Sequence, residues 1–396
     1  MFKSFFQAGF ECTTGYNRDG EWIDLIEDTR HHLHVREDYR RLRAAGIATV
    51  RDAIRWPLVD LGGKYDFSSA RPLVDAAKRY RMEVIWDLFH YGYPDDIEPL
   101  SGAFIDRFAA YCGACAQYLR RHLRGQLWFT PVNEPSYMSW AAGDAAHFAP
   151  HLSGRAFDLK VALIQAAIRG IDAIREWVPD ARFVHADPLC RVAPCDDSHE
   201  AASVARRFNE ECVFESWDML AGRILPELGG SLAHLDVVGV NYYWNCQWVH
   251  GEEGSWLDPD DPRRMPLSEL VGEAWRRYGA EVVISETSHW GEHRAGWMEE
   301  LSGEVEQLLR AGVPLRGVCL YPVIGMLDWH APRRWMPMGL WDIDPDCDMR
   351  RVLHAPMFKA LLRAQRRVLP HLPAPLPAPF GPMRGAVTEL RRTGTA

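Results

Sequence analysis

The sequence predicts a single α/β domain, a (β/α)8 TIM barrel, and three observations support this prediction. Short runs rich in β-branched and aromatic residues alternate with longer amphipathic runs, which is typical of a parallel sheet covered by helices. Eight such units follow one another without a break in composition. No GxGxxG or GxxxxGK[ST] phosphate loop follows an early strand, which disfavours the alternative of an open doubly wound sheet.

Each expected strand is a short apolar run that ends in polar residues where the chain would leave the sheet. The eight runs lie at residues 4–11, 47–53, 82–90, 126–134, 181–187, 235–243, 281–286 and 316–323. Helix-like segments separate them, and one of these covers residues 200–220. Several of the segments stop at a glycine or proline just before the next strand, at Gly46, Gly125, Pro179 and Gly279.

The chain is expected to divide into a barrel domain, residues 1–369, and a C-terminal tail, residues 370–396. The tail begins HLPAPLPAPFGP after Pro370. Because proline precludes a helix and favours extended backbone, the tail is interpreted as a poorly ordered, polyproline-like appendage.

Bulk composition excludes several classes of partner. A net charge of -9 argues against nucleic acid, because proteins that bind a phosphate backbone concentrate Lys and Arg. No run approaches the roughly 18 to 20 apolar residues that span a bilayer, and no signal peptide is recognised. Nine scattered cysteines then favour reduced thiols and a cytoplasmic location, with Cys112 and Cys115 interpreted as buried helix residues.

Two glutamates end strands that lie far apart in the sequence. WFTPVNEP delivers Glu134, and EVVISET delivers Glu286. Active sites of these barrels lie at the carboxyl ends of the strands, so the two side chains are expected to face each other. A retaining glycosidase needs such a pair about 5 to 5.5 Å apart, one to protonate the leaving oxygen and one to attack the sugar carbon. Glu134 is therefore predicted as the acid/base and Glu286 as the nucleophile.

Other strand ends supply the groups that such a pair requires. Glu134 must hold a proton, and both burial and a neighbouring carboxylate raise the pKa of a glutamate. Glu286 must stay ionised, for which Arg51 is the best candidate cation and Tyr243 the best donor hydroxyl. Asn133 is expected to bind the sugar hydroxyl next to the reacting carbon. The polar strand-end residues together are Glu11, Arg51, Asp52, Asp87, His90, Asn133, Glu134, Asp187, Asn241, Tyr242, Tyr243, Glu286 and Tyr321.

These motifs resemble those of glycoside hydrolase family 1, in the clan of retaining (β/α)8 glycosidases. TPVNEP, which contains Glu134, resembles the family's acid/base motif, and VISET places the nucleophile on Glu286. VRDAIRW is similar to the motif that carries the family's arginine, at Arg51. DLFHYGYP places the sugar-binding histidine on His90, and GVNYY places a tyrosine that contacts the nucleophile on Tyr243. The resemblance covers about residues 8 to 365.

The same resemblance implies further contacts with the sugar, and some of these positions depart from the family pattern. MLDWHAPRRWMPMGLWDID is similar to a late family segment and assigns substrate contacts to Asp328 and Trp329. Tyr321 stands where the family carries a tryptophan. At the first strand, Glu11 or Asn17 is expected to replace the family's usual sugar contact. Because these positions shape the site for the non-reducing sugar, hydrolysis is better supported than specificity for glucose.

A group of histidines and a pair of arginines lie outside the expected catalytic site. His31, His32 and His34 lie in a segment that resembles the family's entry into its second strand, so they are interpreted as structural rather than as a metal site. Arg333 and Arg334 lie in the late loop, where they either bind an anionic substituent of the substrate or are solvated surface residues.

The expected function is that of a retaining β-glycosidase, β-glucosidase-like, which hydrolyses small β-glycosides or oligosaccharides by double displacement without a metal or organic cofactor. Besides the residues already named, Asn241 is expected to bind substrate. Three alternatives stay open. They are a retaining hydrolase with mannosidase- or galactosidase-like specificity, a transglycosidase, and a sugar-binding protein on a non-catalytic barrel.

Overall fold

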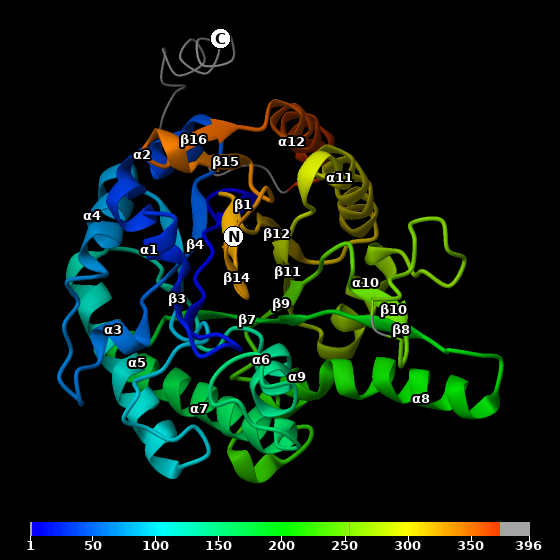
Figure 1. The fold of residues 1–396 in the computed structure, drawn as a ribbon, viewed down its shortest axis with the longest axis horizontal. Helices are drawn as coiled ribbons and strands as arrows, with labels where there is room; N and C mark the ends of the chain where they lie inside the picture. The colour runs from blue at the N-terminus through cyan, green and yellow to red at the C-terminus, as the bar shows by residue number, and fades with distance from the viewer. Residues whose placement is uncertain (1, 253, 373–396) are drawn as a thin grey trace.

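The computed structural model describes residues 2–252 and 254–372. Eight parallel strands close into a barrel at the centre of the molecule (Figure 1). Around the barrel their order is β1 (Phe6–Gly9), β12 (Leu315–Leu320), β11 (Glu281–Thr287), β9 (Val237–Asn241), β7 (Arg182–Pro188), β6 (Trp128–Thr130), β5 (Glu83–Asp87) and β4 (Thr49–Ala53). Each of them falls within or overlaps one of the predicted runs, so the predicted TIM barrel is confirmed.

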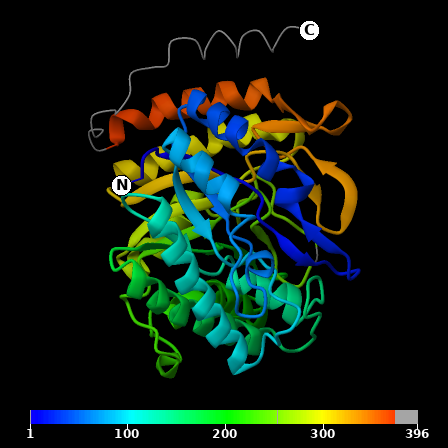
Figure 2. The same ribbon diagram turned by 90° about the vertical axis from the view of Figure 1, so that its left-hand side faces the viewer.

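Helices surround the barrel (Figures 1 and 2). They are α2 (His31–Ala44), α4 (Arg71–Tyr80), α5 (Gly102–His122), α7 (Ala156–Trp177), α9 (Glu215–Leu220), α10 (Leu267–Tyr278), α11 (Arg294–Arg310) and α12 (Ala355–Val368). The last helix, α12, contacts the end of α2, since Gln365 Nε2 donates at 3.0 Å to the carbonyl oxygen of Ala45, the residue that follows α2. Local sequence sets several helix ends. Ser101 caps α5 with its side chain, and Gly279 ends α10 with a left-handed φ of 68°.

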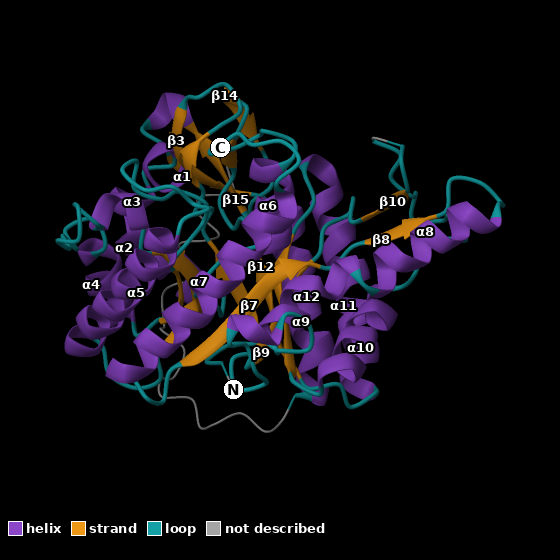
Figure 3. Ribbon diagram, turned by 90° about the horizontal axis from the view of Figure 1, so that it is seen from below, coloured by secondary structure: helices purple, strands orange, loops and turns teal. Residues whose placement is uncertain are grey.

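The helix-like segment 200–220 is broken in the structure. It forms α8 (His199–Glu210), a 3-10 turn η1 (Cys212–Phe214) and α9. In α8 only Ala205 is buried, whereas α9 buries five of its six residues. The two halves therefore have different environments, and α8 projects from the side of the barrel next to the short strands β8 (Arg191–Ala193) and β10 (Gln247–Val249) (Figure 3).

Short hairpins that the sequence did not predict extend the loops after the strands. They are β2 (Thr14–Tyr16) with β3 (Trp22–Asp24), β13 (Met326–Asp328) with β14 (Ala331–Met336), and β15 (Trp341–Asp344) with β16 (Arg350–Leu353). The first two lie at the same end of the barrel as α6 (Pro135–Gly143), which follows β6 (Figure 3). The remaining short elements are α1 (Leu25–Asp28), α3 (Trp56–Val59), η2 (Pro226–Leu228), η3 (Gly291–His293), η4 (Pro345–Cys347) and η5 (Leu369–His371).

Apolar side chains from several strands meet near the N-terminus in one cluster. Phe2 packs on Trp128 there, with ring centroids 4.4 Å apart. The other members are Ile85, Val184, Val237 and Val283, one each from β5, β7, β9 and β11. The polar groups described next lie at or beyond the carboxyl ends of the strands, where barrel enzymes carry their active sites.

The sequence also led to expectations about a C-terminal tail and about membrane-spanning segments. Of the predicted tail, residues 373–396 lie outside them. Among the helices that are described, none is both long and apolar enough to cross a bilayer.

Candidate active site

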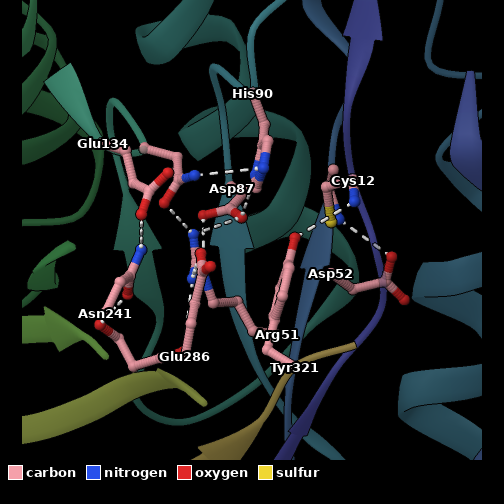
Figure 4. A network of polar contacts seen from close by, with 12 residues as sticks. Cys12, Arg51, Asp52, Asp87, His90, Glu134, Asn241, Glu286 and Tyr321 are labelled. Carbon is pink, nitrogen blue, oxygen red and sulfur yellow. Dashed lines mark hydrogen bonds and ion pairs between the residues drawn. The ribbon is translucent and has the colours of Figure 1, made fainter. Parts of the chain in front are cut away.

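The two predicted glutamates meet at the carboxyl end of the barrel (Figure 4). Glu134 follows β6 and Glu286 lies in β11, and their exposed fractions are 8% and 3%. Asn241, at the end of β9, links them: it is the register partner of Glu286, and its Nδ2 donates to Glu134 Oε1 at 2.8 Å. Ser285 donates to the other end of this amide at 2.6 Å and fixes its orientation.

Glu286 is held by two donors, one for each oxygen. Arg51 Nη1 lies 2.5 Å from Oε1, and the Tyr243 hydroxyl donates to Oε2 at 2.7 Å. Both contacts were predicted from the sequence. The contact with Arg51 is a charge-assisted one, and together the two donors fix the position of both carboxyl oxygens.

The backbone holds Glu134 in an uncommon conformation. Its φ of 45° and ψ of 58° are left-handed, which is unfavourable for a residue with a Cβ atom. Neighbouring contacts keep it there: Glu134 N donates to the carbonyl oxygen of Ala186 at 2.9 Å, and Pro135 begins α6. Ser136 then donates twice to Asp187, from its backbone nitrogen at 3.0 Å and its hydroxyl at 2.6 Å. The side chain of Glu134 is thereby aimed into the site.

The surroundings of Glu134 favour its protonated form. Burial raises the pKa of Glu134 well above its usual range, and the negative charge of Glu286 raises it further. Hydrogen bonds from Asn241 and from Tyr91, whose hydroxyl lies 2.7 Å from Oε2, offset part of this effect. The two glutamates therefore have different partners: Glu134 contacts neutral donors, whereas Glu286 contacts a guanidinium.

Arg51 connects Glu286 to a second row of polar groups, in which hydrogen bonds fix the orientation of the His90 ring. Arg51 Nη2 lies 2.5 Å from Asn133 Oδ1, so the amide nitrogen of Asn133 faces His90 Nε2 at 3.1 Å and the Tyr91 hydroxyl at 3.2 Å. An amide nitrogen only donates, so Nε2 accepts and the imidazole proton lies on Nδ1, which faces Asp87 Oδ2 at 3.1 Å.

Asp87 anchors Arg51 from beneath. Arg51 Nε donates to Asp87 Oδ1 at 3.1 Å, and Nη2 lies 2.9 Å from Oδ2. Although burial alone would raise the pKa of Asp87, Arg51 and His90 together lower it. The guanidinium is thus fixed on one side by Asp87 and on the other by Glu286.

Several predicted sugar contacts lie in the site, with different surroundings. The ring of Tyr321 packs beneath Arg51, whose Cζ lies 5.1 Å from the ring centroid, and is stacked on His90 at 6.0 Å. Trp329 packs on Tyr91 with ring centroids 6.3 Å apart, and its Nε1 has no hydrogen-bond partner within residues 2–252 and 254–372. Glu11 is 6% exposed and lies 3.7 Å from His90 Nε2 through its Oε1.

Two predicted positions are engaged in loop structure instead. Asp328 Oδ1 accepts from the backbone nitrogens of His330 at 2.9 Å and of Ala331 at 3.1 Å, and so holds the turn between β13 and β14. Asn17 Oδ1 accepts from the backbone of the β2–β3 turn, and its Nδ2 donates to the Trp329 carbonyl oxygen at 2.9 Å. Of the two residues proposed for the first-strand contact, Glu11 is the one that lies beside His90.

The histidine cluster contributes to packing below the site. His31 stacks on Phe10 at 3.6 Å, and its Nδ1 and Nε2 lie 2.9 Å from Asp38 and 3.0 Å from Asp52. Although burial lowers the pKa of His31, Asp52 and Asp38 together raise it above the usual value. The side chains of Arg333 and Arg334 are exposed on β14.

One group of side chains has the composition of a metal site. Ligand atoms of Cys12, Asp87 and His90 lie within 4.8 Å of one another. Hydrogen bonds already engage them, because Cys12 Sγ donates to the carbonyl oxygen of Phe10 at 2.9 Å and Asp87 contacts both Arg51 and His90. Burial also raises the pKa of the Cys12 thiol well above its usual value, so the thiolate that a metal requires is disfavoured.

Sequence reasoning missed the role of two residues. Tyr91 connects Glu134 with Asn133, since its hydroxyl donates to Glu134 and accepts from Asn133. Ser285 orients Asn241, as described above. Both residues are neighbours in sequence of a predicted site residue, and that adjacency is the signal that could have found them.

The chain is similar to known proteins in sequence and in fold. Residues 10–219, just over half of the chain, match Glycosyl hydrolase family 1. A search of curated proteins gave no match. Among solved structures, the family 1 β-glucosidase from Thermotoga maritima is 15% identical, with a TM-score of 0.73, and the similarity covers 93% of this chain and 97% of that one.

The complexes of β-glucosidase from Thermotoga maritima with glucoimidazole and with noeuromycin are similar to the same degree. Their identities are 15% and 16%, their TM-scores are 0.72 and 0.73, and each similarity covers 93% of this chain and 98% of the other. These structures share the barrel fold with this chain. The sequence match over residues 10–219 shows that the chain belongs to glycosyl hydrolase family 1.

Proposed function

We propose that this protein is a retaining β-glycosidase that hydrolyses small β-glycosides by double displacement, with Glu134 as acid/base and Glu286 as nucleophile. The observation that carries the proposal is the contrast between the two carboxyl groups. Burial and the charge of Glu286 raise the pKa of Glu134, whereas Arg51 and Tyr243 each bind one oxygen of Glu286. One group is therefore suited to give a proton and the other to form a covalent bond.

The chemistry follows in two steps. In the first, an oxygen of Glu286 attacks the anomeric carbon, the bond from this carbon to the leaving oxygen breaks, and the proton of Glu134 passes to that oxygen. In the second, Glu134 takes a proton from water while the water oxygen attacks the same carbon, which releases Glu286 and the free sugar. Two inversions give net retention of configuration.

Neighbouring groups are arranged to bind the sugar during these steps. Asn133 lies next to Arg51 and Glu134, so it is suited to the hydroxyl beside the reacting carbon, where a contact strengthens in the oxocarbenium-like transition state. His90 lies next to Asn133, with its Nε2 3.1 Å from Asn133 Nδ2, and is suited to bind a neighbouring hydroxyl of the sugar. The indole Nε1 of Trp329 has no partner in the described part of the chain and is available to donate to the sugar.

The sugar itself is best assigned by experiment. That the similar structures are β-glucosidases supports β-glucosides as the first substrates to test. A panel of nitrophenyl glycosides should include mannosides and galactosides, because Glu11, Tyr321 and Asp328 depart from the family pattern at the sugar-binding positions.

The decisive test replaces Glu286 by glycine. Glu286→Gly should abolish hydrolysis of a nitrophenyl β-glycoside, and azide or formate should restore turnover by occupying the space of the missing carboxylate. With azide the product should have the α configuration, whereas the wild type should give a β product, both measured by proton NMR. An undiminished rate in Glu286→Gly, or an α product from the wild type, would contradict the proposal.

A further inference from the structure

Glu11 is a buried carboxyl group in the site that neither step of the proposed reaction uses. It lies two residues beyond the end of β1 and is 6% exposed. Its Oε1 accepts from the backbone nitrogen of Thr13 at 3.0 Å and from the Thr13 hydroxyl at 2.6 Å. Its Oε2 has no hydrogen-bond or ion-pair partner among the residues that the structure describes. One oxygen is therefore fixed, and the other is free to receive a ligand.

Within the described residues, no lysine or arginine forms an ion pair with Glu11, and its one ion-pair contact, with His90, is made through Oε1 rather than through the free oxygen. Arg51 provides one positive charge, which Asp87 and Glu286 already share. His90 Nε2 lies 3.7 Å from Glu11 Oε1, beyond hydrogen-bond distance, and it faces Asn133 Nδ2 at 3.1 Å instead. Burial raises the pKa of Glu11 and is the largest effect. His90 and the hydrogen bonds from Thr13 lower this pKa in part, and the negative charge of Glu286 raises it, so the net direction is upward. A positively charged group on the substrate would remove this imbalance.

The row of contacts indicates where on the sugar this group would lie. Asn133 lies beside the reacting groups, His90 Nε2 is 3.1 Å from Asn133 Nδ2, and Glu11 Oε1 is 3.7 Å beyond His90 Nε2. Glu11 is therefore two contacts away from the anomeric end. The position that it faces is a ring carbon remote from the reacting one, C3 or C4 of a hexose.

We propose that Glu11 determines substrate specificity by forming an ion pair with an ammonium group on C3 or C4 of the sugar, so that the preferred substrates are β-glycosides of amino sugars. This inference rests on the proposed glycosidase function and adds a substrate class to it. A neutral hydroxyl would also donate a hydrogen bond to Glu11, but it would leave the negative charge uncompensated. An ammonium group provides both the hydrogen bond and the charge.

The test compares three nitrophenyl β-glycosides: the glucoside and its 3-amino-3-deoxy and 4-amino-4-deoxy analogues. With wild-type protein, one amino analogue should exceed the glucoside by about tenfold or more in kcat/KM, because a charge-assisted hydrogen bond is roughly twice as strong as a neutral one in a buried site. Glu11→Gln keeps the shape and the contacts with Thr13 but removes the charge, so the ratio of kcat/KM for the amino analogue to kcat/KM for the glucoside should fall to about one. The surface variant Glu211→Gln, whose side chain is 71% exposed, changes the net charge equally and should keep the wild-type preference.

Binding gives a second readout that does not depend on turnover. Calorimetry with the methyl β-glycosides of the same three sugars should show the same order of affinity for the wild type and its loss in Glu11→Gln. If the glucoside is hydrolysed but neither amino analogue is preferred in binding or turnover, the inference about Glu11 is wrong and the glycosidase function stands. If the amino sugars bind preferentially but no glycoside is hydrolysed, the proposed function fails and the specificity of the site stands.

Discussion

Removing the guanidinium of Arg51 should destabilise the fold as well as abolish activity. In Arg51→Met, the carboxylates of Asp87 and Glu286 lose their shared partner, and their side chains are 0% and 5% exposed. Leaving a buried charge unpaired costs about 3–5 kcal/mol, so the free energy of unfolding should fall by at least about 3 kcal/mol at neutral pH. Because Arg51 lowers the folded-state pKa of Asp87, this contribution is present above the unfolded pKa and is lost as the pH falls through the folded one.

Urea denaturation followed by tryptophan fluorescence measures this loss. The matched control is Arg120→Met, because Arg120 forms an exposed ion pair with Asp180 at 2.9 Å and its side chain is 32% exposed. That control should cost less than about 1 kcal/mol. If Arg51→Met lost no more stability than Arg120→Met, or if its deficit grew instead of shrinking toward acidic pH, the assignment of Arg51 as the shared counter-ion would be wrong.

Two further substitutions test the surroundings of Glu134 and the packing of Gly9 against Tyr321. Tyr91→Phe removes a hydrogen-bond donor that lowers the pKa of Glu134. The alkaline limb of the pH profile of kcat/KM, where Glu134 loses its proton, should therefore move to higher pH. A limb that stays in place or moves to lower pH would contradict this role of Tyr91. Gly9→Ala places a Cβ atom 2.0 Å from the Tyr321 ring. The substitution should lower the free energy of unfolding by about 1–3 kcal/mol, measured by thermal denaturation, and it should also reduce activity. Gly296→Ala, with no atom within 4 Å of the new Cβ, is the control and should stabilise helix α11 by about 0.5–1 kcal/mol, whereas equal effects at the two glycines would contradict the close packing.

The barrel could be predicted from the sequence because each of its strands is a local apolar run with its own ending. The hairpins could not, because β2, β3 and β13 are only three residues long and their pairing depends on the loops around them. The break near Glu211 was also missed. The apolar residues on both sides of it gave the appearance of one helix, although only the second half packs against the barrel.

In the site, the residues that were predicted best are those at strand ends. The barrel brings the strand ends together whatever the loops do, so the contacts of Arg51 and Tyr243 with Glu286 followed from position alone. Asp328 is different, because the geometry of a tight turn decides where its carboxylate points. The contacts of Tyr91 with Glu134 and Asn133 depend on the path of the loop after β5, which the periodic pattern of apolar residues in the sequence does not predict.

The contact between β1 and β12 joins the two ends of the folded chain, with Phe6 in register with Val318. During synthesis, β1 leaves the ribosome early, but its second neighbour emerges only when most of the protein has been made. Until then the growing sheet has two unpaired edges, and such edges can pair with other nascent chains. We therefore expect the nascent protein to depend on chaperones until β12 has emerged, and truncations that end before residue 315 to aggregate rather than to form a smaller barrel.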